Sequence, residues 1–250
     1  MTETEQEWLT SADWLGLWIY SASIGRLSDR KKQLFAVATC RRIVHRLVDP
    51  RTFRGLEVTE RFADGEVDEA EWENAFAAVE RASDECYFHQ RPELVQSATR
   101  AVFWSCSGDM DKISRGAAHA ADIDGYDAAI AAGVLTEGAS PEEGKAIWQH
   151  PTFISGRAIG ERIQADLLRE VVGNPFRPVT LNPAWLQWND GTVPRIAQAI
   201  YDERAFGRLP VLADALEDAG CDNADLLAHC RSGGEHVRGC WVVDQLLGKN

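Results

Sequence analysis

Five potential metal ligands lie close together near the end of the sequence: Cys221, His229, Cys230, His236 and Cys240. Thiolate and imidazole are the ligands that tetrahedral zinc prefers in proteins. The spacing Cys230-x5-His236-x3-Cys240 places His236 and Cys240 on one helical face, with Cys221 or His229 as a fourth ligand, but it lacks the tight C-x2-C or H-x3-H pair of most structural zinc sites. Four such ligands leave no position for a catalytic water, so the sequence predicts that a zinc ion here would be structural. The alternative is that the cysteines are small core residues and the histidines cap helix ends.

A second group of potential ligands lies in the middle of the chain, at Asp109, Asp111, His119, Asp122 and Asp124. Carboxylate oxygens and one imidazole are groups that a divalent metal could use in hydrolysis. The group is set among glycine-interrupted turns, where aspartates ordinarily cap helices. The chain contains no P-loop, dinucleotide-binding glycine pattern, nucleophile elbow or H-E-x-x-H motif. A metal-dependent hydrolase is therefore only the third hypothesis.

A basic segment stands out from an acidic chain. The 250 residues carry a formal charge of −13, whereas the segment from Arg26 to Arg54 has nine basic and two acidic residues. On a helical wheel, the helix expected from residue 28 to about residue 48 separates a core face from a basic face, and Phe35 lies near the centre of the basic face. The residues singled out for an interaction surface are Lys31, Lys32, Phe35, Arg42 and Arg46. Such a stripe would attract an acidic protein or a second copy of the chain, unless it is an ordinary solvated or internally paired face.

Charge and composition narrow the class of partner. The net charge disfavours nucleic acid and anionic lipid. No apolar stretch approaches the roughly 20 residues of a membrane span, and the acidic N-terminus does not resemble a secretory signal. Six scattered cysteines are too few for a disulfide-rich secreted scaffold. We therefore expect a cytoplasmic protein that binds a protein partner or itself.

Apolar residues recur at spacings of three and four along most of the chain, and the alternating pattern of strands is almost missing. This pattern predicts an all-α fold, a compact array of short amphipathic helices that is compatible with solenoid-like helix pairs. We expect a single helical domain over 1–250, with a soft boundary near 136–141 between N-terminal and C-terminal halves. Glycines at 116, 125 and 133 predict short helical pieces over 109–135, and three prolines predict an extended segment over 173–183.

Several strings of the sequence are similar to those of an uncharacterised family of helical proteins found mainly in planctomycete bacteria. They are Ser-Asp-Arg-Lys at 28–31, Leu-Phe-Ala at 34–36, Cys-Arg-Arg-Ile at 40–43, Asn-Pro-Phe-Arg-Pro-Val at 174–179, Ala-Ile-Tyr-Asp-Glu-Arg-Ala-Phe at 199–206, Leu-Ala-Asp-Ala-Leu-Glu-Asp-Ala-Gly-Cys-Asp-Asn-Ala-Asp at 212–225 and His-Val-Arg-Gly-Cys-Trp-Val-Val-Asp at 236–244. The run 212–230 also resembles, more weakly, the repeat-companion domains found beside leucine-rich repeats. The family pattern often has paired cysteines where this chain has Thr39-Cys40, which argues against a ligand role there.

The resemblance implies a helical protein but no activity, substrate or catalytic residue. The first hypothesis for function is therefore a non-enzymatic interaction module or adaptor, with no cofactor required. The second is a helical protein that zinc stabilises for a structural or regulatory role.

Overall fold

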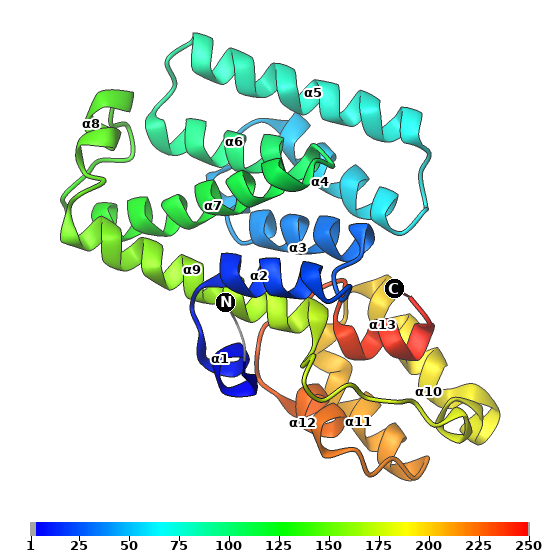
Figure 1. The fold of residues 1–250 in the computed structure, drawn as a ribbon. Helices are drawn as coiled ribbons and strands as arrows, with labels where there is room; N and C mark the ends of the chain where they lie inside the picture. The colour runs from blue at the N-terminus through cyan, green and yellow to red at the C-terminus, as the bar shows by residue number, and fades with distance from the viewer. Residues whose placement is uncertain (1–3, 250) are drawn as a thin grey trace.

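The computed structural model describes residues 4–249, apart from the side chains of residues 110 and 111, and every regular element in this part of the chain is a helix (Figure 1). The all-α prediction is confirmed. The helices are α1 (Glu5–Thr10), α2 (Trp14–Ser23), α3 (Asp29–Arg41), η1 (Val44–Arg46), α4 (Pro50–Ala63), α5 (Glu69–Phe88), α6 (Glu93–Cys106), α7 (Met110–Ala131), α8 (Pro141–Ala146), α9 (Pro151–Val172), α10 (Pro183–Glu203), η2 (Phe206–Arg208), α11 (Leu209–Asp218), α12 (Ala224–Arg231) and α13 (Trp241–Leu247). None of these helices is long and apolar enough to cross a membrane.

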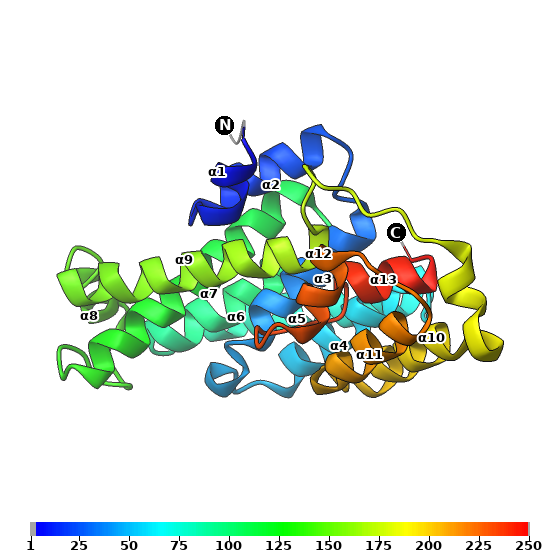
Figure 2. The same cartoon turned by 90° about the horizontal axis from the view of Figure 1, so that it is seen from below.

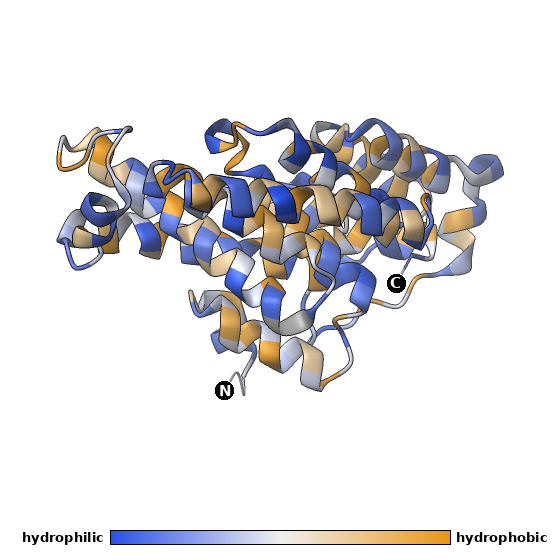
Figure 3. Cartoon of the chain, turned by 90° about the horizontal axis from the view of Figure 1, so that it is seen from above, coloured by the Kyte–Doolittle hydropathy of each residue, from blue (hydrophilic) through white to orange (hydrophobic). Residues whose placement is uncertain are grey.

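The long helices α3 to α7 and α9 form one body, in which α7 lies between α6 and α9 (Figure 1). Helix starts follow the sequence: Ser28, Asp49, Asp68, Ser140 and Asn223 each accept a hydrogen bond from a backbone N–H in the first turn of the next helix. Apolar residues lie along the inward faces of the helices, and polar residues mostly face outward (Figure 3). Helices on both sides of the segment 136–141 share this body, because α9 packs on α7 and α8 packs on α6.

The C-terminal helices α10 to α13 enclose a core of their own at one end of the molecule, opposite α8 (Figure 2). The segment 173–182, which leads into this group, is non-helical, as its prolines predict. The last turn of α9 contacts α13. The end of α9 is thus the place where a side chain from the main body meets the C-terminal helices.

Two helices differ from the sequence expectation. Helix α7 is continuous over Met110–Ala131, although glycines predicted short pieces. A Cβ at Gly116 would lie 2.3 Å from Oγ of Ser105, and one at Gly125 would lie 2.9 Å from the ring of Phe153. These glycines permit the close approach of α6 and α9 to α7 and do not interrupt it. Helix α3 ends at Arg41, followed by the turn η1, where a single helix to about residue 48 was expected.

Candidate metal centre

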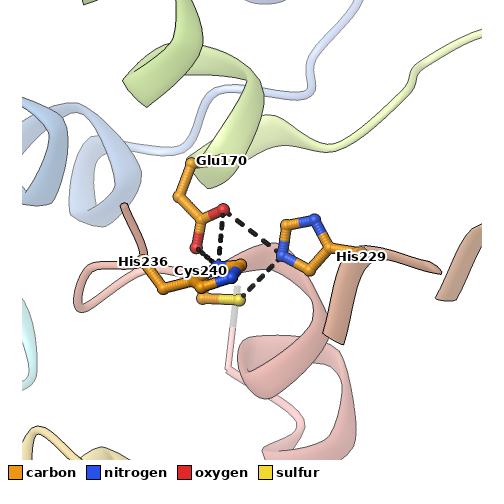
Figure 4. Close-up of side chains that lie close together, drawn as sticks. All are labelled: Glu170, His229, His236 and Cys240. Atoms are coloured by element: carbon orange, nitrogen blue, oxygen red, sulfur yellow. Dashed lines mark hydrogen bonds and ion pairs between the residues drawn. The ribbon is translucent and has the colours of Figure 1, made fainter. Parts of the chain in front are cut away.

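Three of the five predicted C-terminal ligands meet a carboxylate from the main body (Figure 4). Glu170 lies in the last turn of α9, His229 in the last turn of α12, His236 in the loop that follows, and Cys240 directly before α13. One ligand atom from each residue lies within 4.8 Å of the other three. Four side chains from three helix ends and one loop therefore converge on a single point.

The distances suit a small tetrahedral cation. Nδ1 of His236 lies 3.1 Å from one oxygen of Glu170, and Nε2 of His229 lies 3.3 Å from the other oxygen. Nε2 of His229 lies 3.2 Å from Sγ of Cys240. In a tetrahedral zinc shell with bonds of about 2.0–2.3 Å, neighbouring ligand atoms lie about 3.3–3.8 Å apart. Small movements of the four side chains would reach that geometry.

The cluster is sheltered but accessible from one side. Cys240 is fully buried, and the side chains of Glu170, His236 and His229 are 7%, 6% and 16% exposed. A cavity of about 450 Å³ between α9 and the loop 232–236 borders Glu170 and both histidines. Asp166, which pairs with Arg169 at 2.7 Å, also lines the cavity, and the cavity offers a cation a path to the cluster.

The directions of the pKa shifts in the cluster indicate which proton a bound cation would displace. Burial, together with the charge of Glu170, raises the pKa of the Cys240 thiol well above its usual value. Burial also lowers the pKa of His229, although the charge of Glu170 opposes this. At His236, burial acts to lower the pKa, but the hydrogen bond and charge of Glu170 outweigh it and the pKa is raised. Cys240 without a cation is thus a neutral thiol, unsuited to act as a nucleophile, and a bound zinc ion would displace its proton.

The second nitrogens of the two histidines have different partners. Nε2 of His236 lies 3.4 Å from the carbonyl oxygen of Ser232, an acceptor of the kind that metal-bound histidines use. Nδ1 of His229 instead accepts a hydrogen bond from the indole N–H of Trp241, at 3.1 Å. Because an indole can only donate, neutral His229 carries its proton on Nε2, facing Glu170 and Cys240. Zinc could bind Nε2 only if this proton moves to Nδ1 and the hydrogen bond from the Trp241 indole breaks.

The other two predicted ligands do not join the cluster. Cys221 and Cys230 are buried among the apolar side chains of the C-terminal core. Their placement agrees with the alternative interpretation, in which cysteine is a small core residue. Glu170 was not among the predicted ligands, because it lies far upstream of the other three ligands in the sequence. The signal that could have found it is a carboxylate inside the buried apolar run Leu167, Leu168, Val171 and Val172.

The predicted interaction stripe does not form an exposed surface. Phe35 is fully buried, 6.0 Å from the ring of Trp14 and 5.3 Å from that of Trp18, so other side chains cover it and it is not the centre of an exposed basic face. The neighbouring cations have partners within the chain: Arg42 with Asp124 at 3.0 Å, Arg46 with Asp127 at 2.7 Å and with Glu137 at 2.8 Å, and Lys32 with Asp29 at 2.7 Å. Lys31 is partly buried, and this burial lowers its pKa. Arg42 and Arg46 therefore agree with the alternative prediction, in which the basic residues pair with acids within the chain.

The described aspartates of α7 and of the turn before it do not converge on one metal site. Asp122 lies 3.6 Å from Nδ1 of His119 and 3.5 Å from Nε of Arg157, Asp124 pairs with Arg42, and Asp109 pairs with Lys112. The side chain of Asp111 lies outside the described residues. Within residues 4–249 as described, the only convergent group of potential metal ligands is the cluster of Glu170, His229, His236 and Cys240.

Comparison of the chain with models of protein families, with curated proteins and with solved structures found no match. The family grouping drawn from the sequence strings therefore stays a prediction.

Proposed function

We propose that this chain is a zinc-stabilised helical protein, in which one zinc ion bound by Glu170, His229, His236 and Cys240 joins the C-terminal helices to α9. The observation that carries this proposal is the convergence of the four ligand atoms within 4.8 Å from separate parts of the chain. Sulfur and imidazole ligands favour zinc over magnesium or calcium, which prefer oxygen.

A metal ion would add a link between two short helices and the loop that joins them. Helices α12 and α13 have eight and seven residues, shorter than helices that persist alone in water, and the loop 232–239 between them contains no regular structure. Three of the four ligands lie in or beside these elements. Because the binding free energy of a structural zinc ion contributes to folding, the ion would stabilise the whole segment 224–247 against α9.

The same ligand set argues for a structural role and against catalysis. Catalytic zinc ordinarily has three protein ligands and a water, whereas four protein ligands close the shell. Cys240 is fully buried, and Glu170 is in contact with both histidines, so it is not free to act as a general base toward a substrate. An adaptor role in the cytoplasm stays a separate prediction, for which no surface has been located.

The experiment is a metal analysis of the full chain with a matched pair of cysteine variants. Protein purified without added metal and then dialysed against zinc is measured by inductively coupled plasma mass spectrometry. We expect one zinc ion per chain in the wild type and in Cys230→Ala, and well under half of that in Cys240→Ala. Both cysteines are fully buried in the same core, so the pair separates loss of a ligand from loss of a buried thiol. Equal zinc in the two variants, or no zinc in the wild type, would contradict the proposal.

A further inference from the structure

Three arginine side chains from separate parts of the chain line a small cavity beside the C-terminal loop. Arg41 is the last residue of α3, Arg204 directly follows α10, and Arg238 lies in the loop before α13. The cavity has a volume of about 230 Å³, and Glu60 of α4 also lines it. None of these four residues is a candidate zinc ligand, although His236, which is one, also lines the cavity.

Arginines outnumber acids among the side chains that line this cavity: Arg41, Arg204 and Arg238 against Glu60 and Glu235. Glu60, which is 2% exposed, is shared by two arginines: it lies 2.7 Å from Nη2 of Arg41 and 2.8 Å from Nη1 of Arg204. Arg238 lies 3.2 Å from the buried carboxylate of Asp64. That carboxylate also faces Arg30 at 3.0 Å and Lys249 at 3.8 Å. Glu235, the other acid that lines the cavity, is exposed. Arg30 has a further carboxylate in Asp244, and Arg238 has one in Glu66, so the uncompensated positive charge lies at Arg41 and Arg204, which share the single buried carboxylate of Glu60.

Two donors in the arginine group have no acceptor. Within the described part of the chain, the buried Nε–H groups of Arg41 and Arg238 have no hydrogen-bond partner. The side chain of Arg238 is only 10% exposed. Because nearly all buried donors in proteins are paired, each of these two groups can take a further acceptor.

The backbone at Arg204 gives independent support. This residue has φ 53° and ψ 30°, a left-handed conformation that glycine or asparagine usually adopts after the end of a helix. A long cationic side chain in that position carries a backbone cost and directs its guanidinium to Glu60 at the cavity wall.

We propose that this cavity binds a small oxyanion through the carboxylate or phosphate group that it carries. The planar donor fork of arginine matches the oxygens of both groups, and three forks from three elements would surround one such group. Burial and the charge of Arg238 lower the pKa of Arg41, and a bound anion would oppose both effects. The proposal does not depend on zinc.

The test uses inorganic phosphate and malonate as probes of the two anion types. Binding to the full chain is measured by calorimetry, and the melting temperature is measured against sodium chloride at equal ionic strength. The variants are Arg204→Gln and a matched control, Arg208→Gln, which removes a half-exposed arginine paired with Glu203 outside the cavity. A third variant, Arg204→Gly, suits the left-handed backbone and removes the guanidinium without adding strain.

We expect phosphate, malonate or both to raise the melting temperature of the wild type and of Arg208→Gln beyond the effect of chloride. We expect binding to weaken at least tenfold in both Arg204 variants. A response to one probe alone identifies the group that the site accepts. Two outcomes would overturn the proposal: no response of the wild type to either probe, or an equal response of wild type and Arg204→Gly.

Discussion

The indole N–H of Trp241 donates to Nδ1 of His229, so the nitrogen of His229 that faces Glu170 and Cys240 carries the proton of the neutral ring. Trp241 directly follows the ligand Cys240 and begins α13. Its hydrogen bond stabilises the metal-free form of the cluster and competes with a cation at Nε2. A residue beside the centre thus sets how tightly it would hold zinc.

We therefore expect Trp241→Phe to bind zinc more tightly than the wild type. Loss of one hydrogen bond that exists only in the metal-free form should favour the bound form by about 1 kcal/mol, or roughly fivefold in affinity. Competition with a chromophoric chelator measures this. Trp185→Phe is the control, because Trp185 is buried in the same core and is not part of the cluster. Weaker binding by Trp241→Phe than by this control would contradict the role assigned to the indole.

Removal of zinc should loosen the C-terminal helices first. Zinc at a hundred times its dissociation constant contributes roughly 2.7 kcal/mol, which corresponds to roughly 5–11 °C in melting temperature for a chain of this size. On addition of a chelator, hydrogen exchange should accelerate in α12 and α13 before α6 and α7. Cys240→Ala should show no response to the chelator. Uniform acceleration of hydrogen exchange along the chain, or a response of Cys240→Ala equal to that of the wild type, would contradict a local stabilisation of α12 and α13 by zinc.

Gly116→Ala should destabilise the protein although alanine is the better helix former. Alanine gains about 1 kcal/mol in helix propensity, but its Cβ would lie 2.3 Å from Oγ of Ser105 and 2.9 Å from the carbonyl oxygen of Ala101. Overpacking of this kind costs about 1–3 kcal/mol. Urea denaturation measures the change, with Gly207→Ala as the control, since no neighbouring atom lies within 4 Å of its added Cβ. A more stable Gly116→Ala would show that α6 and α7 can separate without cost.

Substitution of the buried Arg30 should destabilise the protein far more than substitution of a half-exposed arginine. Its guanidinium lies 2.6 Å from Asp244 of α13 and 3.0 Å from Asp64 beside α4. Arg30→Met would leave both carboxylates buried with one cation fewer, a change that costs about 3–5 kcal/mol. Arg54→Met removes a half-exposed arginine that pairs with Glu57 and Glu71, and should cost about 1 kcal/mol or less. Equal free energies of unfolding for the two variants would show that the buried ion pairs of Arg30 stabilise the protein no more than the exposed pairs of Arg54.

Local patterns in the sequence were enough for the all-α fold, for most of the helices and for three of the four residues in the candidate centre. Helix periodicity and capping residues depend on neighbours in the chain, so they can be read without the fold. A carboxylate inside an apolar run marks Glu170 as unusual, but only the packing of α13 on the end of α9 brings it to His236. Phe35 shows the same limit. A wheel separates charged from apolar positions, but it does not show that Trp14 and Trp18 cover the aromatic ring.

X-ray absorption at the zinc edge of the loaded full chain shows whether the ion has a closed shell of one sulfur and three lighter ligands. We expect four-coordinate zinc with one sulfur at about 2.3 Å and three nitrogen or oxygen ligands at about 2.0–2.1 Å. In Glu170→Gln the shell should lose its carboxylate oxygen while keeping the sulfur. Two or more sulfur ligands would mean that Cys221 or Cys230 takes part, and a six-coordinate shell of light atoms without sulfur would place the metal elsewhere; either result would contradict the centre described above.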